Sequence, residues 1–423
     1  MLKQIEGSHA MAEAIALCRP EVICAYPITP QTHIVEGLGD LVRTGELAGC
    51  EFINVESEFA ALSVAIGASA GGARAYTATA SQGLLYMAEA VYNASGLGLP
   101  IVMTLGNRAI GAPINIWNDH SDAMSMRDAG WMQLFAETNQ EAVDLHIQAF
   151  RLAEEMSMPV MVCVDGFILT HAFERVDIPS QADVDAYLPP YEPVQVLDTA
   201  HPMSIGAMVG PDAFTEVRFL QHYKQTQALG LIPELAAEFE ARFGRKSGGL
   251  LRTYRTEDAE VIAVALGSVN GTIKDTVDEL REGGMRIGLD ARRIPAVSAG
   301  ARAAGARERP PRGGDREERR RRHGRATGQR HRVRAQAGEG RAAGAFRGGG
   351  ARRAADHVQV ARRNVPPGCR GAVGGDAVPR PRRAHRRHRD PPARAYPPLR
   401  TDGREHPQAA GPVRPAESRG VKP

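Results

Sequence analysis

The sequence predicts an α/β fold in which helices cover both faces of a parallel β-sheet. Through the first 290 residues, short apolar runs that end in Gly, Pro, Ser or Thr alternate with longer amphipathic or Ala-rich stretches. Two of the runs, residues 101–105 and 160–164, are apolar at almost every position. Such runs are typical of strands that are buried on both faces, as in parallel sheets.

The alternation gives the expected order of elements. Strands are expected at residues 21–25, 51–55, 73–77, 100–105 and 159–164. Helices are expected at residues 8–18, 31–43, 57–71, 81–95 and 140–156. A Pro-rich connection at 188–214 leads to a largely helical stretch at 215–246, after which a second strand and helix pattern begins. The sequence thus predicts one large α/β domain and the start of a second.

Charge divides the chain into two parts. The first 290 residues hold 18 Lys and Arg against 38 Asp and Glu, whereas residues 291–423 hold 34 against 11. The first part has no run near the roughly 18 apolar residues of a membrane span, and the N-terminus lacks the pattern of a secretory signal. We therefore expect a soluble, acidic globular protein in the cytoplasm.

The Arg-rich segment after residue 290 cannot bury enough apolar surface to fold, so it is expected to be disordered. It contains 33 Arg but one Lys, and it has no Met or Trp. One interpretation is a basic tail that binds nucleic acid or anionic membrane. The other is a GC-rich gene read in the wrong frame. Codons for residues 294–298, read one base later, can encode Phe-Arg-Pro-Phe-Pro.

The five cysteines are scattered without a C-x-x-C pair: Cys18, Cys24, Cys50, Cys163 and Cys369. This pattern argues against a zinc site, an iron-sulfur cluster or a redox dithiol on this chain. Buried reduced thiols are expected instead. The chain also lacks the glycine-rich motifs of dinucleotide and P-loop nucleotide sites.

Polar residues follow the ends of four expected strands, where ligands bind in open parallel sheets. They lie in the segments YPITPQT (26–32), ESE (56–58), ATASQG (78–83) and GNRAIG (106–111). Individually, Thr32, Ser57 or Ser81 could cap a helix, Glu58 could interact with a helix dipole, and Arg108 could form a surface ion pair. Their occurrence at one edge favours a binding crevice.

These segments and others resemble one family over essentially residues 1–289. The chain is similar to the alpha subunits of pyruvate:ferredoxin oxidoreductases and their 2-oxoacid:acceptor relatives, which depend on thiamine diphosphate. The matching stretches include AYPITPQTHIVE (25–36), VESEFAALSVAIGASAGGARAYTATASQG (55–83) and LPIVMTLGNRAIGAPINIWNDHSDAMSMRDAGWMQLFAE (99–137). Family members continue with a Phe-Arg-Pro-Phe-Pro-like segment, so the resemblance ends where the composition changes and supports a frameshift near Asp290.

The resemblance implies the domain organisation. Residues 1–250 would form the pyrimidine-binding domain of the thiamine-diphosphate fold. Residues 255–289 would be the truncated start of a transketolase C-terminal-like domain. Residues 290–423 would be the disordered tail, interpreted as a frameshift product.

The resemblance also implies three site residues. Glu58 matches the glutamate that binds N1′ of the cofactor's aminopyrimidine and so promotes loss of the thiazolium C2 proton. Thr29 and Arg108 match residues that contact the 2-oxoacid, with Arg108 suited to its carboxylate and Thr29 to its keto oxygen. The expected reaction is oxidative decarboxylation of a 2-oxoacid, most simply pyruvate, to acyl-CoA and CO₂.

Further partners follow from the same resemblance. A beta subunit would supply the Mg²⁺ and diphosphate ligands, and gamma- and delta-type subunits, with ferredoxin as acceptor, would carry the iron-sulfur clusters. No metal ligand is assigned to this chain: Asp119, His120 and Asp122 could bind a cation, but a polar loop is favoured. His9, His33 and His171 are interpreted in the same way, as caps, core or surface residues.

Two alternatives remain open. The chain could be half of another thiamine-diphosphate enzyme of the transketolase or oxoacid dehydrogenase type. It could also be an inactive truncated product whose basic tail binds nucleic acid, although nucleic acid is not the expected partner.

Overall fold

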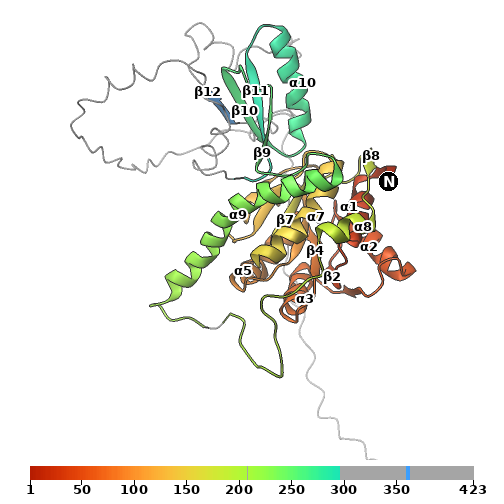
Figure 1. Cartoon of the computed structure of the whole chain (residues 1–423), viewed down its shortest axis with the longest axis vertical. Coiled ribbons are helices and arrows are strands. Elements are labelled where there is room, and N and C mark those ends of the chain that lie inside the picture. Colours follow the sequence, from red (N-terminus) through yellow and green to blue (C-terminus); the bar gives the residue numbers. More distant parts are fainter. Residues whose placement is uncertain (207, 296–358, 363–423) are drawn as a thin grey trace, which may run out of the picture. The chain divides into compact units, whose positions relative to one another are not determined.

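A computed structural model of the chain describes residues 1–206, 208–295 and 359–362. Its largest sheet has six strands in the order β3-β2-β4-β5-β7-β6, and every neighbouring pair is parallel (Figure 1). These strands are β2 (Val22–Ala25), β3 (Glu51–Asn54), β4 (Ala75–Thr79), β5 (Val102–Asn107), β6 (Met132–Phe135) and β7 (Val160–Asp165).

Alternate side chains of the central strands enter two separate cores. In β7, Val160 and Val162 belong to one core, whereas Met161 and Cys163 belong to the other. The first core is covered by α1 (Gly7–Leu17), α2 (Thr32–Thr44), α7 (Asn139–Met156) and α9 (Phe214–Phe243). The second is covered by α3 (Glu58–Ala70), α4 (Ser81–Tyr86) and α5 (Ala88–Gly96). The prediction of a parallel sheet buried on both faces is confirmed.

Helices α3 and α7 begin at residues whose side chains cap them. The Ser57 hydroxyl accepts a hydrogen bond from the Ala60 amide, 3.2 Å away, at the start of α3. Thr138 does the same for the Glu141 amide at the start of α7, also at 3.2 Å. These bonds satisfy amides that have no partner within the helix. The structure therefore shows Ser57 as a helix cap, the first of the two interpretations considered for it; the other was a residue of the binding crevice.

Some elements were not predicted. The antiparallel pair β1 (Leu2–Glu6) and β8 (Phe173–Asp177) is rich in charged and polar residues, so it lacks the apolar signal of the other strands. The expected helix at 81–95 is divided at Met87 into α4 and α5. Two short helices were also missed, α6 (Ser121–Ser125) and α8 (Gln181–Tyr187).

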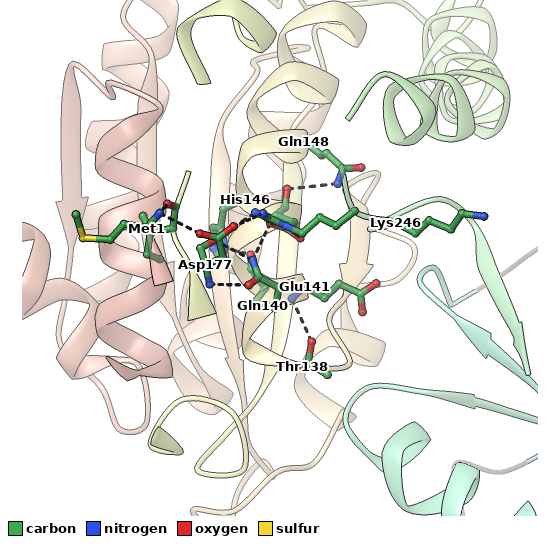
Figure 2. Close-up of polar contacts among 12 residues, drawn as sticks. Met1, Thr138, Gln140, Glu141, His146, Gln148, Asp177 and Lys246 are labelled. Atoms are coloured by element: carbon green, nitrogen blue, oxygen red, sulfur yellow. Dashed lines mark hydrogen bonds and ion pairs between the residues drawn. The ribbon is translucent and has the colours of Figure 1, made fainter. Parts of the chain in front are cut away.

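Polar contacts tie the segment after α9 to α7 and to β8 (Figure 2). Arg245 donates to the carboxylate of Asp144 at 2.6 Å and to that of Asp177 at 3.1 Å. The Gln140 side chain accepts a hydrogen bond from the Asp177 amide at 2.8 Å and donates to Asp144 at 3.1 Å. The described chain therefore stays attached to the first domain beyond the end of α9.

The second sheet has four strands in the order β12-β10-β11-β9. They are β9 (Leu251–Tyr254), β10 (Val261–Leu266), β11 (Ile287–Arg292) and β12 (Gln359–Arg362), and α10 (Val269–Glu282) connects β10 to the parallel strand β11. The sheet starts at Leu251, earlier than the expected residue 255. The expected boundary between residues 289 and 290 falls inside β11, and the described chain continues to Pro295 with Arg293 and Ile294 buried.

Strand β12 lies in the segment that was expected to be disordered. It pairs antiparallel with β10 from Gln359 to Arg362, so the expectation is wrong for these four residues. Pairing uses only backbone groups, and the edge of β10 offers them to any extended segment. The same expectation of disorder covers residues 296–358 and 363–423. These residues lie outside the part of the chain that the structure describes. Within that part, no helix has both the length and the apolar character needed to cross a bilayer.

Candidate active site

The candidate site lies at the carboxyl ends of four adjacent strands, β3, β2, β4 and β5. Thr29 follows β2, Glu58 follows β3, Ser81 follows β4 and Arg108 comes directly after β5. Because the strands are parallel, all four segments emerge at the same edge of the sheet. The structure therefore brings together the four loops that the sequence singled out.

Arg108 links two of these loops through its guanidinium group. One terminal nitrogen donates to the backbone oxygen of Thr29 and the other to the side-chain oxygen of Gln82, both at 2.6 Å. Neither acceptor is a carboxylate, and Nε is buried without a hydrogen-bond partner in the described part of the chain. Burial lowers the pKa of Arg108, with the nearby Asp122 carboxylate opposing the shift. Arg108 is therefore a cation held in a fixed position, and its Nε–H group makes no hydrogen bond with the described residues.

Glu58 is the first residue of α3 and only 9% exposed. Its carboxylate makes no hydrogen bond or ion pair with another described residue. Helix α4 approaches it closely at Gly83. A Cβ atom at this position would lie 2.8 Å from Oε1 of Glu58 and 2.5 Å from Oγ1 of Thr79. The helix can therefore come this close to the carboxylate only because residue 83 has no side chain.

Thr29 is exposed and follows β2 in the loop that Arg108 holds. Its backbone oxygen is occupied by Arg108, whereas its hydroxyl makes no hydrogen bond with another described residue. Contacts thus run from Thr29 through Arg108 to Gln82, next to Gly83 and Glu58. The three residues expected at the site are brought into one connected group.

Asp122 organises the site in a way that the sequence did not reveal. Its fully buried carboxylate accepts hydrogen bonds from the backbone amides of Ser81 at 3.0 Å and Arg108 at 2.9 Å, and from the Asn107 side chain at 2.8 Å. Burial raises the pKa of Asp122 to about 6, against these donors, which lower it. The only sequence signal was its place in the polar segment 118–122, where a metal was considered.

The three candidate metal ligands of that segment do not converge. His120 contacts Asp165, with 2.6 Å between Nε2 and Oδ1, and Asp165 in turn accepts from Ser268. Asp119 accepts from the Ser121 amide at 2.7 Å, and Asp122 is surrounded by amide donors. The alternative of a polar loop beside the site is therefore the better description.

Several large apolar side chains are exposed in the segments at and after these strands. They are Tyr26 after β2, Ile53 in β3, Phe59 in α3, and Ile114, Ile116 and Trp117 in the connection between β5 and α6. The Trp117 ring also contacts Phe167, with 5.0 Å between the ring centroids. Large apolar groups gathered at a rim of polar residues mark interaction surfaces. We call these six residues the apolar rim.

A parallel sheet covered on both faces, with a carboxylate and a fixed arginine at its carboxyl edge, is typical of an α/β enzyme domain whose candidate ligand site lies at that edge. A family model described as pyruvate flavodoxin/ferredoxin oxidoreductase, thiamine diphosphate-binding, matches residues 13–235. The chain belongs to this family.

Relatives agree with the family model. The chain is 52% identical over 287 residues to a pyruvate synthase subunit PorA of Methanosarcina barkeri, covering 67% of this chain and 71% of that protein. It is 48% identical to the PorA of Thermotoga maritima over 67% of this chain and 73% of that protein. It is 41% identical to a ketoisovalerate oxidoreductase subunit VorA of Pyrococcus horikoshii, over 68% of this chain and 73% of that protein.

The fold also has a counterpart among solved structures. A 2-oxoglutarate:ferredoxin oxidoreductase from Magnetococcus marinus, solved with 2-oxoglutarate, coenzyme A and succinyl-CoA bound, superposes with a TM-score of 0.55 at 18% identity. The match covers 72% of this chain and 56% of that chain. At this identity the likeness concerns the fold alone.

Proposed function

We propose that the chain is the alpha subunit of a pyruvate:ferredoxin oxidoreductase, which converts pyruvate and coenzyme A to acetyl-CoA and CO₂ and passes electrons to ferredoxin. The observation that carries the proposal is that one edge of the sheet holds both the buried Glu58 carboxylate, which has no partner among the described residues, and the fixed Arg108 cation. The first is suited to proton exchange with a bound cofactor, and the second to the carboxylate of a 2-oxoacid.

The residues fit thiamine diphosphate. A buried carboxylate without a protein partner can exchange a hydrogen bond with a ring nitrogen, and Gly83 keeps the space beside it free of a side chain. When bound, thiamine diphosphate supplies the electron sink that lets the bond between the keto and carboxylate carbons break. Glu58 would hold the pyrimidine ring and carry a proton at its carboxylate oxygen.

Arg108 and Thr29 would position the substrate. The guanidinium of Arg108 is held by two neutral acceptors, so its charge stays available to the carboxylate of the 2-oxoacid. The Thr29 hydroxyl, on the loop that Arg108 holds, would donate to the keto oxygen as negative charge develops there. By accepting hydrogen bonds from the amides of both Ser81 and Arg108, Asp122 would hold these two backbone segments in fixed positions relative to each other.

Partner subunits complete the proposal. The apolar rim supports a beta subunit that covers the site and supplies the Mg²⁺ and diphosphate ligands. The placement of the iron-sulfur clusters on gamma- and delta-type partners is supported by the cysteines of the described residues, which are free, buried and on separate segments: Cys18, Cys24, Cys50 and Cys163. Reduced thiols are also the rule in the cytoplasm, the location proposed for the enzyme.

Pyruvate is proposed as the substrate because pyruvate synthase subunits match this chain at 47–52% identity, against 41% for the ketoisovalerate oxidoreductase subunit. The test is reduction of a viologen dye or ferredoxin by the complex assembled with its partner subunits and coenzyme A. We expect a higher kcat/KM for pyruvate than for 2-oxoisovalerate. A preference for the branched substrate would contradict the assignment.

The role of Glu58 is tested in the same assay. We expect Glu58→Gln to lower kcat about 10²- to 10⁴-fold, as loss of acid–base catalysis does, while the thermal midpoint stays close to that of the wild type. Glu56→Gln, an exposed position two residues earlier, is the matched control and should keep full activity. Equal activity of the two variants would remove Glu58 from the proposed mechanism.

A further inference from the structure

Three chain segments that are distant in sequence place a carboxylate and two imidazoles together. Glu6 ends β1, His33 is the second residue of α2, and His171 lies in the segment between β7 and β8. One ligand atom from each residue lies within 4.8 Å of the others. Nδ1 of His33 is 2.7 Å from a carboxylate oxygen of Glu6, and the rings of His33 and His171 are 4.8 Å apart.

A fourth side chain borders the group. Nδ1 of His9 lies 3.7 Å from the second carboxylate oxygen of Glu6, and its ring is 6.1 Å from that of His33. The side chains of His9 and His33 are about half exposed, whereas that of Glu6 is largely covered. The group is thus anchored at the carboxylate and accessible from solvent on its imidazole side.

The His171 ring is held in place by neighbouring residues. It stacks on Phe167 with 4.2 Å between the centroids, and its Nδ1 is 2.7 Å from the hydroxyl of the buried Thr170. That hydroxyl also accepts a hydrogen bond from the Phe167 amide. Metal-binding histidines commonly use one ring nitrogen for such an outer contact and the other for the ion.

The ligand types favour a transition cation. The group offers one carboxylate and imidazole nitrogens. Imidazole nitrogen and carboxylate oxygen together suit first-row transition cations, whereas Mg²⁺ and Ca²⁺ prefer oxygen ligands alone.

We propose that Glu6, His33 and His171 form a binding site for a divalent first-row transition cation, represented by Zn²⁺, with His9 as the fourth ligand. Zinc–ligand distances of about 2.0–2.1 Å in a tetrahedral site place ligand atoms about 3.3 Å apart. Side-chain rotations that draw the three atoms together by roughly 1.5 Å would close the site. The cation would then join the start of α2, which follows the Thr29 loop, to β1 and to the segment after β7.

The test is Zn²⁺ titration of the metal-free full chain by competition with a chromophoric chelator. We expect the double variant His33→Gln/His171→Gln to lose one equivalent or to bind it about 100-fold more weakly. His201→Gln/His222→Gln, two exposed histidines elsewhere, is the matched control and should titrate like the wild type. Background binding of Zn²⁺ by the remaining histidines occurs in the wild type and in both double variants.

A second measurement keeps the proposal falsifiable if the double variant folds poorly. Glu6→Gln preserves the size of the side chain, and we expect it to abolish both the rise of the thermal midpoint on adding Zn²⁺ and the visible absorption of tetrahedral Co²⁺. Unchanged Zn²⁺ stoichiometry and affinity in the double variant, or unchanged Co²⁺ absorption in Glu6→Gln, would overturn the site.

Discussion

Residue 83 is where a missing side chain matters most for the candidate site. At Gly83, helix α4 lies so close to Glu58 and Thr79 that a Cβ atom would clash with both side chains. Thr79 Oγ1 is buried without a hydrogen-bond partner in the described part of the chain. The position of the Glu58 carboxylate therefore depends on a glycine in α4.

We expect Gly83→Ala to lower kcat at least about 10-fold, because misplacing a catalytic group by a fraction of an ångström is costly. The new methyl group must displace both the Glu58 carboxylate and the Thr79 hydroxyl. Gly67→Ala in α3 is the control, since a Cβ there meets nothing within 4 Å. That change should keep activity and add about 0.5–1 kcal/mol of stability. Wild-type kcat in Gly83→Ala would contradict the close packing.

The residues of the site differ in how far the sequence could reveal them. Thr29, Glu58 and Arg108 stand in distinctive segments at strand ends. Because the strands are predicted to be parallel, these segments are expected at the same edge of the sheet. Asp122 does not follow a strand, and its partners Ser81 and Arg108 belong to two other loops. A hydrogen-bond acceptor of this kind becomes visible only when the loops are placed in space.

At the scale of elements, α7 is attached to the sheet by a chain of buried hydrogen bonds. The Tyr76 hydroxyl lies 2.6 Å from that of Thr104, which lies 2.6 Å from Nε2 of His146. Nδ1 of His146 donates to the Ala142 backbone oxygen at 2.7 Å. Because a carbonyl can only accept, this bond places the ring proton on Nδ1 and leaves Nε2 to accept from Thr104. Burial lowers the pKa of His146 to about 4.

The neutral His146 makes stability depend on pH. Its folded pKa is below the unfolded value of 6.5, so its contribution is complete above pH 6.5 and is lost as pH falls towards 4. We expect the stability difference between wild type and His146→Gln to shrink by about 3 kcal/mol between pH 7 and pH 4. Denaturant unfolding across this range measures it.

The control for this measurement is His222→Gln, an exposed histidine in α9. Its stability should follow the wild-type pH curve throughout. A constant difference between wild type and His146→Gln from pH 7 to pH 4 would show that the buried imidazole is not the titrating group.

At the scale of the whole molecule, one arginine joins elements that lie about 150 residues apart in sequence. Arg293, immediately after β11, is fully buried and forms ion pairs with Glu137 and Glu141 at the start of α7. Lys274 of α10 also pairs with Glu137. The expected boundary at residue 290 had excluded Arg293 from the folded part. Its burial shows that the ordered chain extends further.

We expect Arg293→Ala to destabilise the protein by about 3–5 kcal/mol, since it removes the ion-pair partner of the buried Glu141 and one of the two partners of the buried Glu137. The measurement is the denaturant midpoint at pH 7. The compensating variant Arg293→Ala/Glu137→Gln/Glu141→Gln removes the unpaired charges and should recover part of the loss. A single variant as stable as wild type would show that the ion pairs contribute little.

The change in composition near residue 290 bears on what the intact protein is. The shifted codon reading begins at Ile294, directly after the buried Arg293, and relatives match 287 residues of this chain. We propose that the reading frame is displaced there. Sequencing the gene across codons 288–300 should reveal a single-base displacement that restores Phe-Arg-Pro-Phe-Pro. Codons that encode the printed residues without displacement would make the Arg-rich segment a genuine part of the protein.

The sequence by itself determined the α/β class, the strands buried on both faces and the segments at their ends that hold Thr29, Glu58 and Arg108. These features are local, because apolar periodicity and strand-end motifs are written within a few consecutive residues. Only the tertiary structure decided the strand order, the bonds of Asp122, the burial of Arg293 and the grouping of Glu6, His33 and His171. Such contacts join residues far apart in the chain, and packing brings them together without any signature in the local sequence.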